Sequence, residues 1–336
     1  MKTRVITSVL LLAAMSAPAA IAQSLTGAGA SFPAPIYQKW FGEYKAKNPA
    51  VQINYQSIGS GGGIRQLTEN TVDFGASDMP MTNEQIAAVK IRPLHFPTVL
   101  GAVVVTYNLS GITPKLRLDG PAISAIFMGQ IKKWNDPKIR ATNPSLALPD
   151  KLIVVVHRSD SSGTTFVWTD YLSRVSPEWK SKVGANSAVS WPTGLGSKGN
   201  EGIAGAVKQN PYSIGYVELV YAVQNKMAYA DVKNAAGKFI TPGFDSVTAA
   251  AASVKDMPAD FRVSITNPPG AAAYPISSFT WLLIPSRISD LAKKKAITEF
   301  LKWMLTEGQK DAERMSYAPL PKNVVAKVEM QIAEIK

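Results

Sequence analysis

The apolar and polar residues of this chain follow two periods, and the period changes at short polar turns. Residues 51–57 alternate with the period of two that is typical of a half-buried strand, whereas residues 35–47 place Ile36, Trp40 and Tyr44 at helical spacing. The same pattern predicts strands at 25–30, 72–76, 99–108, 152–157, 214–217 and 279–284, and helices at 64–70, 165–173, 202–209, 247–253 and 297–305. Strands that alternate with helices predict α/β domains.

Three serine-containing turns stand where a predicted strand gives way to a helix. They are Ser31-Phe32-Pro33, Ser60-Gly61-Gly62-Gly63 and Ser162-Gly163-Thr164-Thr165. A helix N-terminus has N–H groups without intrahelical partners and the positive end of the helix dipole, so amide and hydroxyl groups there can surround an anion. Each turn taken singly could be an ordinary helix cap. Three together predict a site for a tetrahedral anion.

The first 22 residues predict a cleavable secretory signal. Lys2 and Arg4 precede an apolar run from Val5 to Met15, and Ala20-Ile21-Ala22 resembles a cleavage site. The run is shorter than the ~20 apolar residues of a spanning helix. We therefore expect the protein to be exported. The chain has no cysteine, which excludes a disulfide framework, a thiolate metal site and a cysteine nucleophile.

The length of the chain bears on the number of domains, and its net charge bears on the partners it can bind. About 314 residues remain after the signal, which favours two domains of roughly 150 residues, and the Pro- and Gly-rich residues 267–275 are predicted to pass between them. The net charge is +12, or about +10 without Lys2 and Arg4. This excess could keep the protein soluble, attract small anions, or bind nucleic acid or anionic lipid. Because the basic residues are scattered, nucleic acid is the least supported alternative.

Two charged positions carry candidate chemistry. Arg158 follows the strand at 152–157, and its planar guanidinium suits an oxyanion, with Asp160 two residues later. Asp78 follows the strand at 72–76 and could be a simple loop charge. In an anion site, however, a carboxylate accepts the proton of monohydrogen phosphate, whereas sulfate has no proton to donate at neutral pH. Asp78 would then select phosphate by repelling sulfate.

Other functional motifs are weak. Residues 194–199 spell GxGxxG, but Trp191-Pro192-Thr193 stands where a dinucleotide fold needs a buried strand, so a Gly-rich loop that opens the next helix is the better interpretation. The two histidines, His95 and His157, lie far apart, and His157 is predicted simply to end a strand. Neither HExxH nor GxSxG occurs. We expect no catalytic group, no metal and no cofactor.

Six motifs in order resemble the periplasmic phosphate-binding proteins of ABC-type phosphate uptake systems. They are LTGAGASFPAP at 25–35, IGSGGG at 58–63, VDFGASD at 72–78, IKKWND at 131–136, RSDSSGT at 158–164 and IGYVE at 214–218. The resemblance spans nearly the whole chain after the signal. Two positions depart from the family pattern: Ser31 stands where threonine is common, and Gly61 where serine is common.

The resemblance implies a two-domain α/β periplasmic binding protein fold of type II, with mixed sheets flanked by helices and the ligand in the cleft between the domains. Domain I would comprise 24–101 plus 276–336, and domain II 102–275. The implied phosphate-binding residues are Ser31, Phe32, Ser60, Asp78, Arg158, Ser162, Gly163 and Thr164, with Asp160 orienting Arg158.

The function implied is high-affinity binding of inorganic phosphate in the periplasm and its delivery to an ABC-type permease in the inner membrane. The protein would be a monomer with no nucleic-acid partner. Two alternatives stay open: a secreted phosphatase that uses the same anion site, and a binding protein for sulfate, molybdate or another oxyanion. Asp78 is the residue that distinguishes a phosphate-binding protein from a binding protein for another oxyanion.

Overall fold

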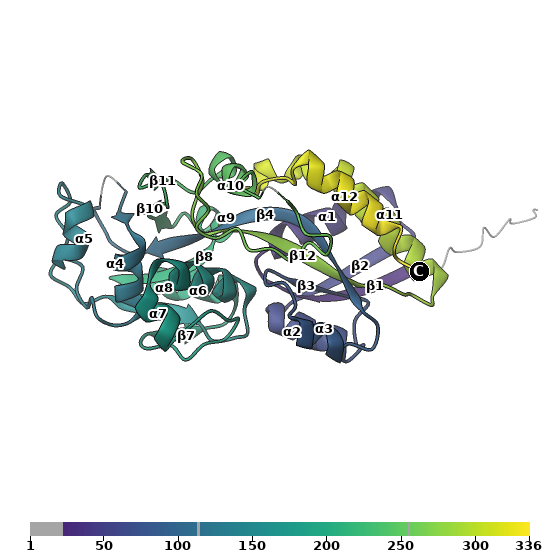
Figure 1. Cartoon of the computed structure of the whole chain (residues 1–336), viewed down its shortest axis with the longest axis horizontal. Coiled ribbons are helices and arrows are strands. Elements are labelled where there is room, and N and C mark those ends of the chain that lie inside the picture. The colour runs from purple at the N-terminus through teal and green to yellow at the C-terminus, as the bar shows by residue number, and fades with distance from the viewer. Residues whose placement is uncertain (1–22, 113–114, 255) are drawn as a thin grey trace, which may run out of the picture.

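Two α/β halves share one long strand (Figure 1). A computed structural model describes residues 23–112, 115–254 and 256–336, and the predicted signal at 1–22 lies outside these ranges. The shared strand, β4 (Pro93–Tyr107), runs along the long axis of the molecule. It pairs with β12 (Ser277–Pro285) as far as Ala102 and with β8 (Ser213–Glu218) from Val103 onward. Every residue of β4 is buried, which explains its apolar run.

The first half of the sheet has the strand order β2-β1-β3-β12-β4. The first three of these strands are parallel, and β12 runs antiparallel to both β3 and β4. The elements of this half are β1 (Gln23–Gly29), α1 (Ala34–Lys47), β2 (Val51–Ser57), α2 (Ser60–Thr68), β3 (Phe74–Ser77), α3 (Asn83–Ala88), α11 (Leu291–Thr306), two 3-10 turns (Gly308–Asp311 and Glu313–Met315) and α12 (Lys322–Ile332).

The second half has the order β7-β6-β8-β4-β9, with β6 parallel to β7 and β8, and β4 antiparallel to β8 and β9. Its elements are α4 (Gly120–Phe127), α5 (Pro137–Thr142), β6 (Val154–Arg158), α6 (Gly163–Val175), α7 (Pro177–Lys182), β7 (Leu195–Ser197), α8 (Gly199–Gln209), α9 (Leu219–Gln224), β9 (Ala228–Tyr229) and α10 (Phe244–Ala251). A small separate sheet joins β5 (Arg117–Leu118), β10 (Asp231–Lys233) and β11 (Phe239–Ile240).

The two halves repeat one topology. In each, the second parallel strand lies outside the first, the third lies on its other side, and an antiparallel strand follows: β2-β1-β3-β12 in one half and β7-β6-β8-β4 in the other. No sequence repeat predicts this duplication. Because ligands of open α/β sheets bind beyond the carboxyl ends of the parallel strands, each half supplies such an edge.

Aromatic packing holds α6, whose first turn contains the predicted site residues Gly163 and Thr164, against the sheet of the second half. Trp168 of α6 stacks on Tyr216 of β8 with ring centroids 4.8 Å apart, and both side chains are fully buried. The Tyr216 hydroxyl lies 2.6 Å from Thr165 Oγ1 and accepts the Arg158 N–H at 3.2 Å. This packing therefore ties the N-terminus of α6 to the end of β6.

The predicted α/β alternation is confirmed, but five helices begin more than one residue earlier than predicted. Among them, α8 begins at Gly199 and not at 202, α10 at Phe244 and not at 247, and α11 at Leu291 and not at 297. The helix α2 begins at Ser60 and not at 64, and α6 begins at Gly163 and not at 165. Glycines that indicate a turn in the sequence occupy the first turns of these helices, where their lack of a Cβ permits close approach. Short helices that packing stabilises, such as α4 and α9, had no clear sequence signal. No helix of the described ranges has the length and apolar character needed to cross a bilayer.

Candidate anion-binding site

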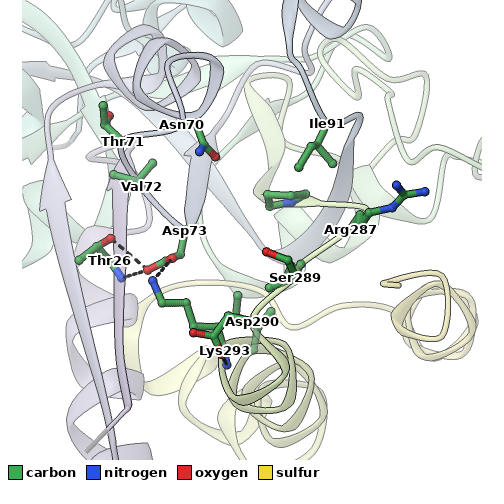
Figure 2. A pocket seen from close by; sticks show the side chains of 13 residues that line it. Thr26, Asn70, Thr71, Val72, Asp73, Ile91, Arg287, Ser289, Asp290 and Lys293 are labelled. Atoms are coloured by element: carbon green, nitrogen blue, oxygen red, sulfur yellow. Dashed lines mark hydrogen bonds and ion pairs between the residues drawn. The ribbon is translucent and has the colours of Figure 1, made fainter.

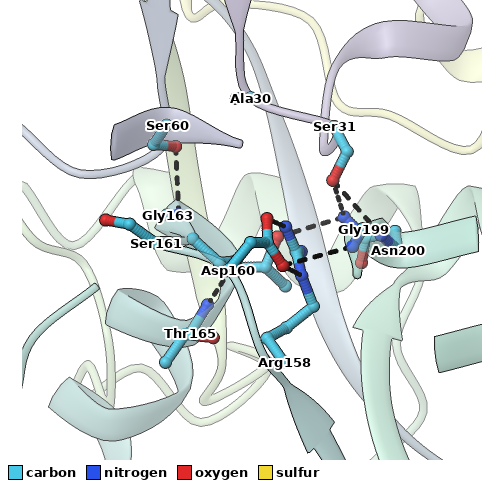
Figure 3. Close-up of polar contacts among 12 residues, drawn as sticks. Ala30, Ser31, Ser60, Arg158, Asp160, Ser161, Gly163, Thr165, Gly199 and Asn200 are labelled. Atoms are coloured by element: carbon cyan, nitrogen blue, oxygen red, sulfur yellow. Dashed lines mark hydrogen bonds and ion pairs between the residues drawn. The ribbon is translucent and has the colours of Figure 1, made fainter. Parts of the chain in front are cut away.

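The predicted site residues meet between the two halves, at the carboxyl ends of their parallel strands (Figure 3). The first half brings the turns that follow β1, β2 and β3, and the second half brings the turns that follow β6 and β7. All but one of the nine predicted residues are buried, and Asp160 is half-buried. The structure thus brings together residues that are spread over more than a hundred positions of the sequence.

Ser60 joins the halves through its hydroxyl. Its Oγ accepts the N–H of Asp78 at 3.2 Å. It also accepts the N–H of Gly163 at 3.0 Å (Figure 3). A hydroxyl has two lone pairs and a single proton. Since both lone pairs face fixed N–H donors, the proton of Ser60 stays available for an anion in the site.

Arg158 is the buried cation of the site. Its Nε and Nη2 donate to the two carboxylate oxygens of Asp160 at 2.7 and 2.5 Å, which fixes the plane of the guanidinium. Burial lowers the pKa of Arg158, but the hydrogen bonds and charge of Asp160 outweigh it, so the pKa is raised. Within the described residues, Nη1 is buried without a hydrogen-bond partner. Such a donor is suited to an anionic ligand, because an unpaired buried N–H is costly.

Asp160 holds Arg158 as the sequence predicts, and it also joins a further turn. Its Oδ1 accepts the N–H of Gly199 at 3.2 Å. Gly199 has φ = 73°, in the left-handed region where glycine is favoured. Burial raises the pKa of Asp160, but the contacts with Arg158 and the Gly199 N–H together lower it by more. The pKa is therefore lowered, and the carboxyl group stays ionised at neutral pH.

Asp78 lies at the end of β3 with an exposed fraction of 1%. Thr280 of β12 donates to its Oδ1 at 2.8 Å. Burial raises the pKa of Asp78 to about 7, although the Thr280 hydrogen bond, the charge of Arg158 and the Thr164 hydroxyl each lower it. A carboxyl group with this pKa is about half ionised at pH 7 and mostly ionised at pH 8, and the ionised form can accept the phosphate proton in a hydrogen bond.

The turn that opens α6 approaches the first half closely. Ser162 caps the helix by accepting the N–H of Thr165 at 3.1 Å, and the N–H groups of Gly163 and Thr164 belong to the first turn. A Cβ on Gly163 would lie 2.7 Å from the Cβ of Asp78 and would also collide with Ser60 Oγ. Glycine at this position therefore permits contact between the halves.

Gly163→Ala is expected to weaken phosphate binding by about 10- to 100-fold, because the added methyl group overpacks only the contact between the halves. Titration calorimetry measures the loss, and the melting temperature of the ligand-free protein is expected to change little. The matched control is Gly205→Ala in α8, where no atom lies within 4 Å of the added Cβ. Equal phosphate affinity in the Gly163 and Gly205 variants would contradict the steric argument.

The turn after β1 places Ser31 and Phe32 at the same location. Tyr221 of α9 donates its hydroxyl to the Ser31 carbonyl at 2.6 Å, and Tyr317 donates to the Phe32 carbonyl at 2.7 Å. The Phe32 ring is fully buried and packs near Gly101 and Tyr317. Phe32 can therefore serve an anion through its backbone N–H and not through its side chain.

Two buried polar residues of the site were not recognised from the sequence. Asn200, at the start of α8, contacts Ser31, Thr164 and Glu218. The rejected GxGxxG run leads into α8, as predicted, but it is not a loop throughout, because Leu195–Ser197 forms β7. Nothing in the run identifies its next residue as part of an anion site. Glu218 is the last residue of β8, whereas Asp78 directly follows β3, and burial raises the pKa of Glu218 well above the usual range.

The structure leaves no room for a side chain at Gly61. A Cβ at Gly61 would overlap the side chain of Ser161, which comes from the other half. Ser161 Oγ lies 2.9 Å from Ser187 Oγ, and Gly61 donates its N–H to the Ser161 carbonyl at 3.0 Å. Here the hydroxyl between the halves comes from residue 161 instead of residue 61.

The histidines do not join this site. His95 is buried in β4, accepts the Met81 N–H at 3.0 Å through Nε2, and burial lowers its pKa to about 4. His157 lies in β6, as predicted, and stacks on Trp191 with centroids 4.6 Å apart. Across the described ranges, no group of three or more His, Asp or Glu residues is arranged to hold a metal ion.

A cavity of about 410 Å³ lies away from this site, beside the start of β3 and the start of α11 (Figure 2). Asp73 in its wall accepts the Thr26 N–H and the Lys293 ammonium, each at 2.7 Å. Asp73 precedes β3, whereas Asp78 follows it. The cavity therefore lies at the opposite end of β3 from the anion site, where the ion pair between Asp73 and Lys293 joins α11 to the strands.

Comparisons with known proteins agree with this architecture. A family model described as a PBP superfamily domain matches residues 14–307. The phosphate-binding protein PstS of Xylella fastidiosa is 48% identical over 307 residues, covering 91% of this chain and 84% of its own. The PstS protein of Haemophilus influenzae is 46% identical over 316 residues, covering 94% of each chain.

Solved structures share the fold. A phosphate-binding protein from Stenotrophomonas maltophilia superposes with a TM-score of 0.73 at 20% identity, covering 92% of this chain and 94% of its own. An ABC-type phosphate transport receptor from Vibrio cholerae gives a TM-score of 0.57 at 18% identity, covering 88% and 100%. The expected two-domain α/β fold is confirmed by these likenesses and by the two halves described above.

Proposed function

Because this chain belongs to the PBP superfamily, and within it to the PstS phosphate-binding proteins, we propose that it binds inorganic phosphate between its two halves and delivers it to an ABC-type permease. The observation that carries the proposal is the meeting of Arg158 Nη1, a buried cationic donor, with Asp78, a buried acceptor, between two sets of hydroxyl and N–H donors. Phosphate needs both kinds of group, since monohydrogen phosphate accepts many hydrogen bonds and donates one.

The ligand set of this proposal is the predicted one. Arg158 neutralises charge, while Asp78 accepts the phosphate proton. The remaining donors are the hydroxyl or N–H groups of Ser31, Phe32, Ser60, Ser162 and Thr164. Gly163 belongs to the predicted set, and its N–H donates to Ser60 Oγ in this structure, so it acts on the anion through that hydroxyl or by sharing its proton. Asp160 acts through Arg158, which it holds by two hydrogen bonds. The selection against sulfate follows from Asp78, because sulfate would place an unprotonated oxygen against a carboxylate.

Closure of the two halves presents the loaded protein to its partner. Domain I comprises 24–101 plus 276–336 and domain II comprises 102–275 in this proposal. The change of partner strand along β4, between Ala102 and Val103, supports the first crossing, and residues 267–275 lead directly into β12. A ligand that contacts both domains only when they are closed favours the closed state, and the permease can recognise that shape.

The cellular setting is also part of the proposal. The protein is exported through its N-terminal signal to the periplasm, works as a monomer, carries out no catalysis and binds no nucleic acid. The family consists of substrate-binding proteins, which supports a role without chemistry on the ligand. The proposed permease is an ABC transporter of the inner membrane.

Titration calorimetry of phosphate-free protein at pH 8, where Asp78 with a pKa of about 7 is mostly ionised, tests the proposal. We expect one phosphate to bind per chain and sulfate to give no heat, since Asp78 repels an anion that has no proton. Equal binding of both anions would contradict the role of Asp78. Binding of neither would contradict the proposed function, and hydrolysis of a phosphate ester would favour a phosphatase.

A further inference from the structure

Asn200 connects hydroxyl groups from both halves of the protein. It is fully buried at the start of α8 (Figure 3). Its Nδ2 donates to Ser31 Oγ at 2.9 Å and to Thr164 Oγ1 at 3.1 Å, and its backbone N–H donates to Ser31 Oγ at 3.3 Å. Ser31 belongs to the first half, whereas Thr164 and Asn200 belong to the second.

The orientation of the Asn200 amide is fixed at its other end. Its Oδ1 accepts the backbone N–H of Glu218 at 2.9 Å. A backbone N–H only donates, so the amide atom that faces it must be the oxygen. The NH₂ group must then face the two hydroxyls. In a flipped amide, the Asn200 NH₂ group would face the Glu218 N–H, so two donors would meet and the buried N–H would lose its acceptor.

The direction of these hydrogen bonds decides what the two hydroxyls can do. Each hydroxyl that accepts a hydrogen bond from Asn200 keeps its own proton for donation to another acceptor. Ser60 reaches the same state by accepting from the N–H groups of Asp78 and Gly163. Without such a donor, a hydroxyl loses one of the hydrogen bonds that fix its rotation, so its proton is no longer held in one direction.

We propose that Asn200 is a positioning residue that holds the Ser31 and Thr164 hydroxyls as hydrogen-bond donors to the bound anion, in a network that forms only when the two halves are closed. The inference rests on the proposed function, because it assigns the anion as phosphate. Asn200 itself acts through the two hydroxyls and does not contact the ligand. Its effect on binding therefore exists only while those hydroxyls are present.

A double-mutant cycle tests this dependence, with phosphate affinity measured by calorimetry. We expect Asn200→Ala to weaken phosphate binding by about 10-fold or more in the otherwise wild-type protein, since two donors to a charged ligand lose their orientation. In a Ser31→Ala/Thr164→Val background, which has no hydroxyls to orient, we expect the same substitution to change the affinity less than about 2-fold.

The cycle separates orientation from mere structural support. A structural role through the Glu218 N–H would weaken binding equally in both backgrounds, and that result would overturn the inference. If wild-type protein bound no phosphate at all, the proposed function would fail and the inference with it, which is a different outcome from additive effects in a protein that does bind.

A second variant covers the case in which Asn200→Ala does not fold. Asn200→Asp keeps an acceptor for the Glu218 N–H, but its carboxylate accepts the hydroxyl protons that the anion needs. We expect Asn200→Asp to bind phosphate about 100-fold more weakly than wild type at pH 8. Affinity within a factor of two of wild type would also overturn the inference.

Discussion

Replacing Arg158 with alanine is expected to weaken phosphate binding on the order of 1,000-fold. Arg158 is the buried cation of the site, and its Nη1 has no protein partner among the described residues. Truncation of one member of a buried charged pair costs about 2–5 kcal/mol, and every ~1.4 kcal/mol is a factor of ten in affinity. Calorimetry with phosphate measures the loss, and binding of other tetrahedral anions should fall with it.

Two further variants separate the site from general charge. Arg287→Ala removes the same charge from an exposed position beside the cavity of Figure 2, and it should leave phosphate affinity within about 2-fold. Arg158→Lys keeps a cation but loses the paired contacts with Asp160, so an intermediate loss is expected. Equal affinities of the Arg158→Ala and Arg287→Ala proteins would refute the assignment of Arg158.

Asp78→Asn is expected to lower the preference for phosphate over sulfate by at least about 100-fold. The amide removes the negative charge that repels sulfate, and its NH₂ group can donate to an unprotonated oxygen. Phosphate should bind more weakly because its proton loses a charged acceptor. Parallel titrations with both anions at pH 8 measure the change. The matched control is Asp73→Asn, at the opposite edge of the same sheet, which should leave the preference unaltered.

The role of Asp78 would be wrong if the variant bound phosphate as before and still gave no response to sulfate. Its titration offers an independent check. Because burial raises the pKa of Asp78 to about 7 from an unfolded value near 3.9, the folded protein binds the extra proton between about pH 4 and 7. The free energy of unfolding therefore falls as the pH rises through this window, and the loss is complete above pH 7.

Asp78→Asn removes that penalty. The ligand-free variant should accordingly gain stability over wild type at pH 8, by an order of a few kcal/mol, and little at pH 4. Thermal unfolding at the two pH values measures the difference. The sign matters more than the size, because an Asp78 stabilised mainly by Arg158 would show the opposite pH dependence.

The local parts of the site follow from the chain itself. Ser162 caps α6 because a hydroxyl satisfies the N–H of Thr165 three residues later. Ser60, in contrast, begins α2 without capping it, and its hydroxyl accepts from residues that are distant in the sequence. Arg158 and Asp160 pair across two residues. The motif resemblance also identified the family, which the relatives confirm. The assignment of the individual ligands stays a prediction, and the variants above test it.

Other features depend on segments that are distant along the chain. Asn200 is 169 residues from Ser31, and Thr280 is 202 residues from Asp78, so neither contact has a local signature. The fit of Gly61 against Ser161 likewise arises only when the two halves meet. The repeated topology of the halves was also invisible, because strand order is set by packing and not by sequence similarity.

The sequence by itself therefore determined the α/β elements, the Ser162 cap of α6, the charged pair at the end of β6 and the family. These depend on hydrogen bonds and periodicity within a few residues, or on motifs that survive in order. The tertiary structure alone decided the burial that raises the pKa of Asp78, the donor that fixes the Ser31 and Thr164 hydroxyls, and the close approach at Gly163. Desolvation, proton direction and steric contact are properties of groups brought together in space, and only the folded chain brings them together.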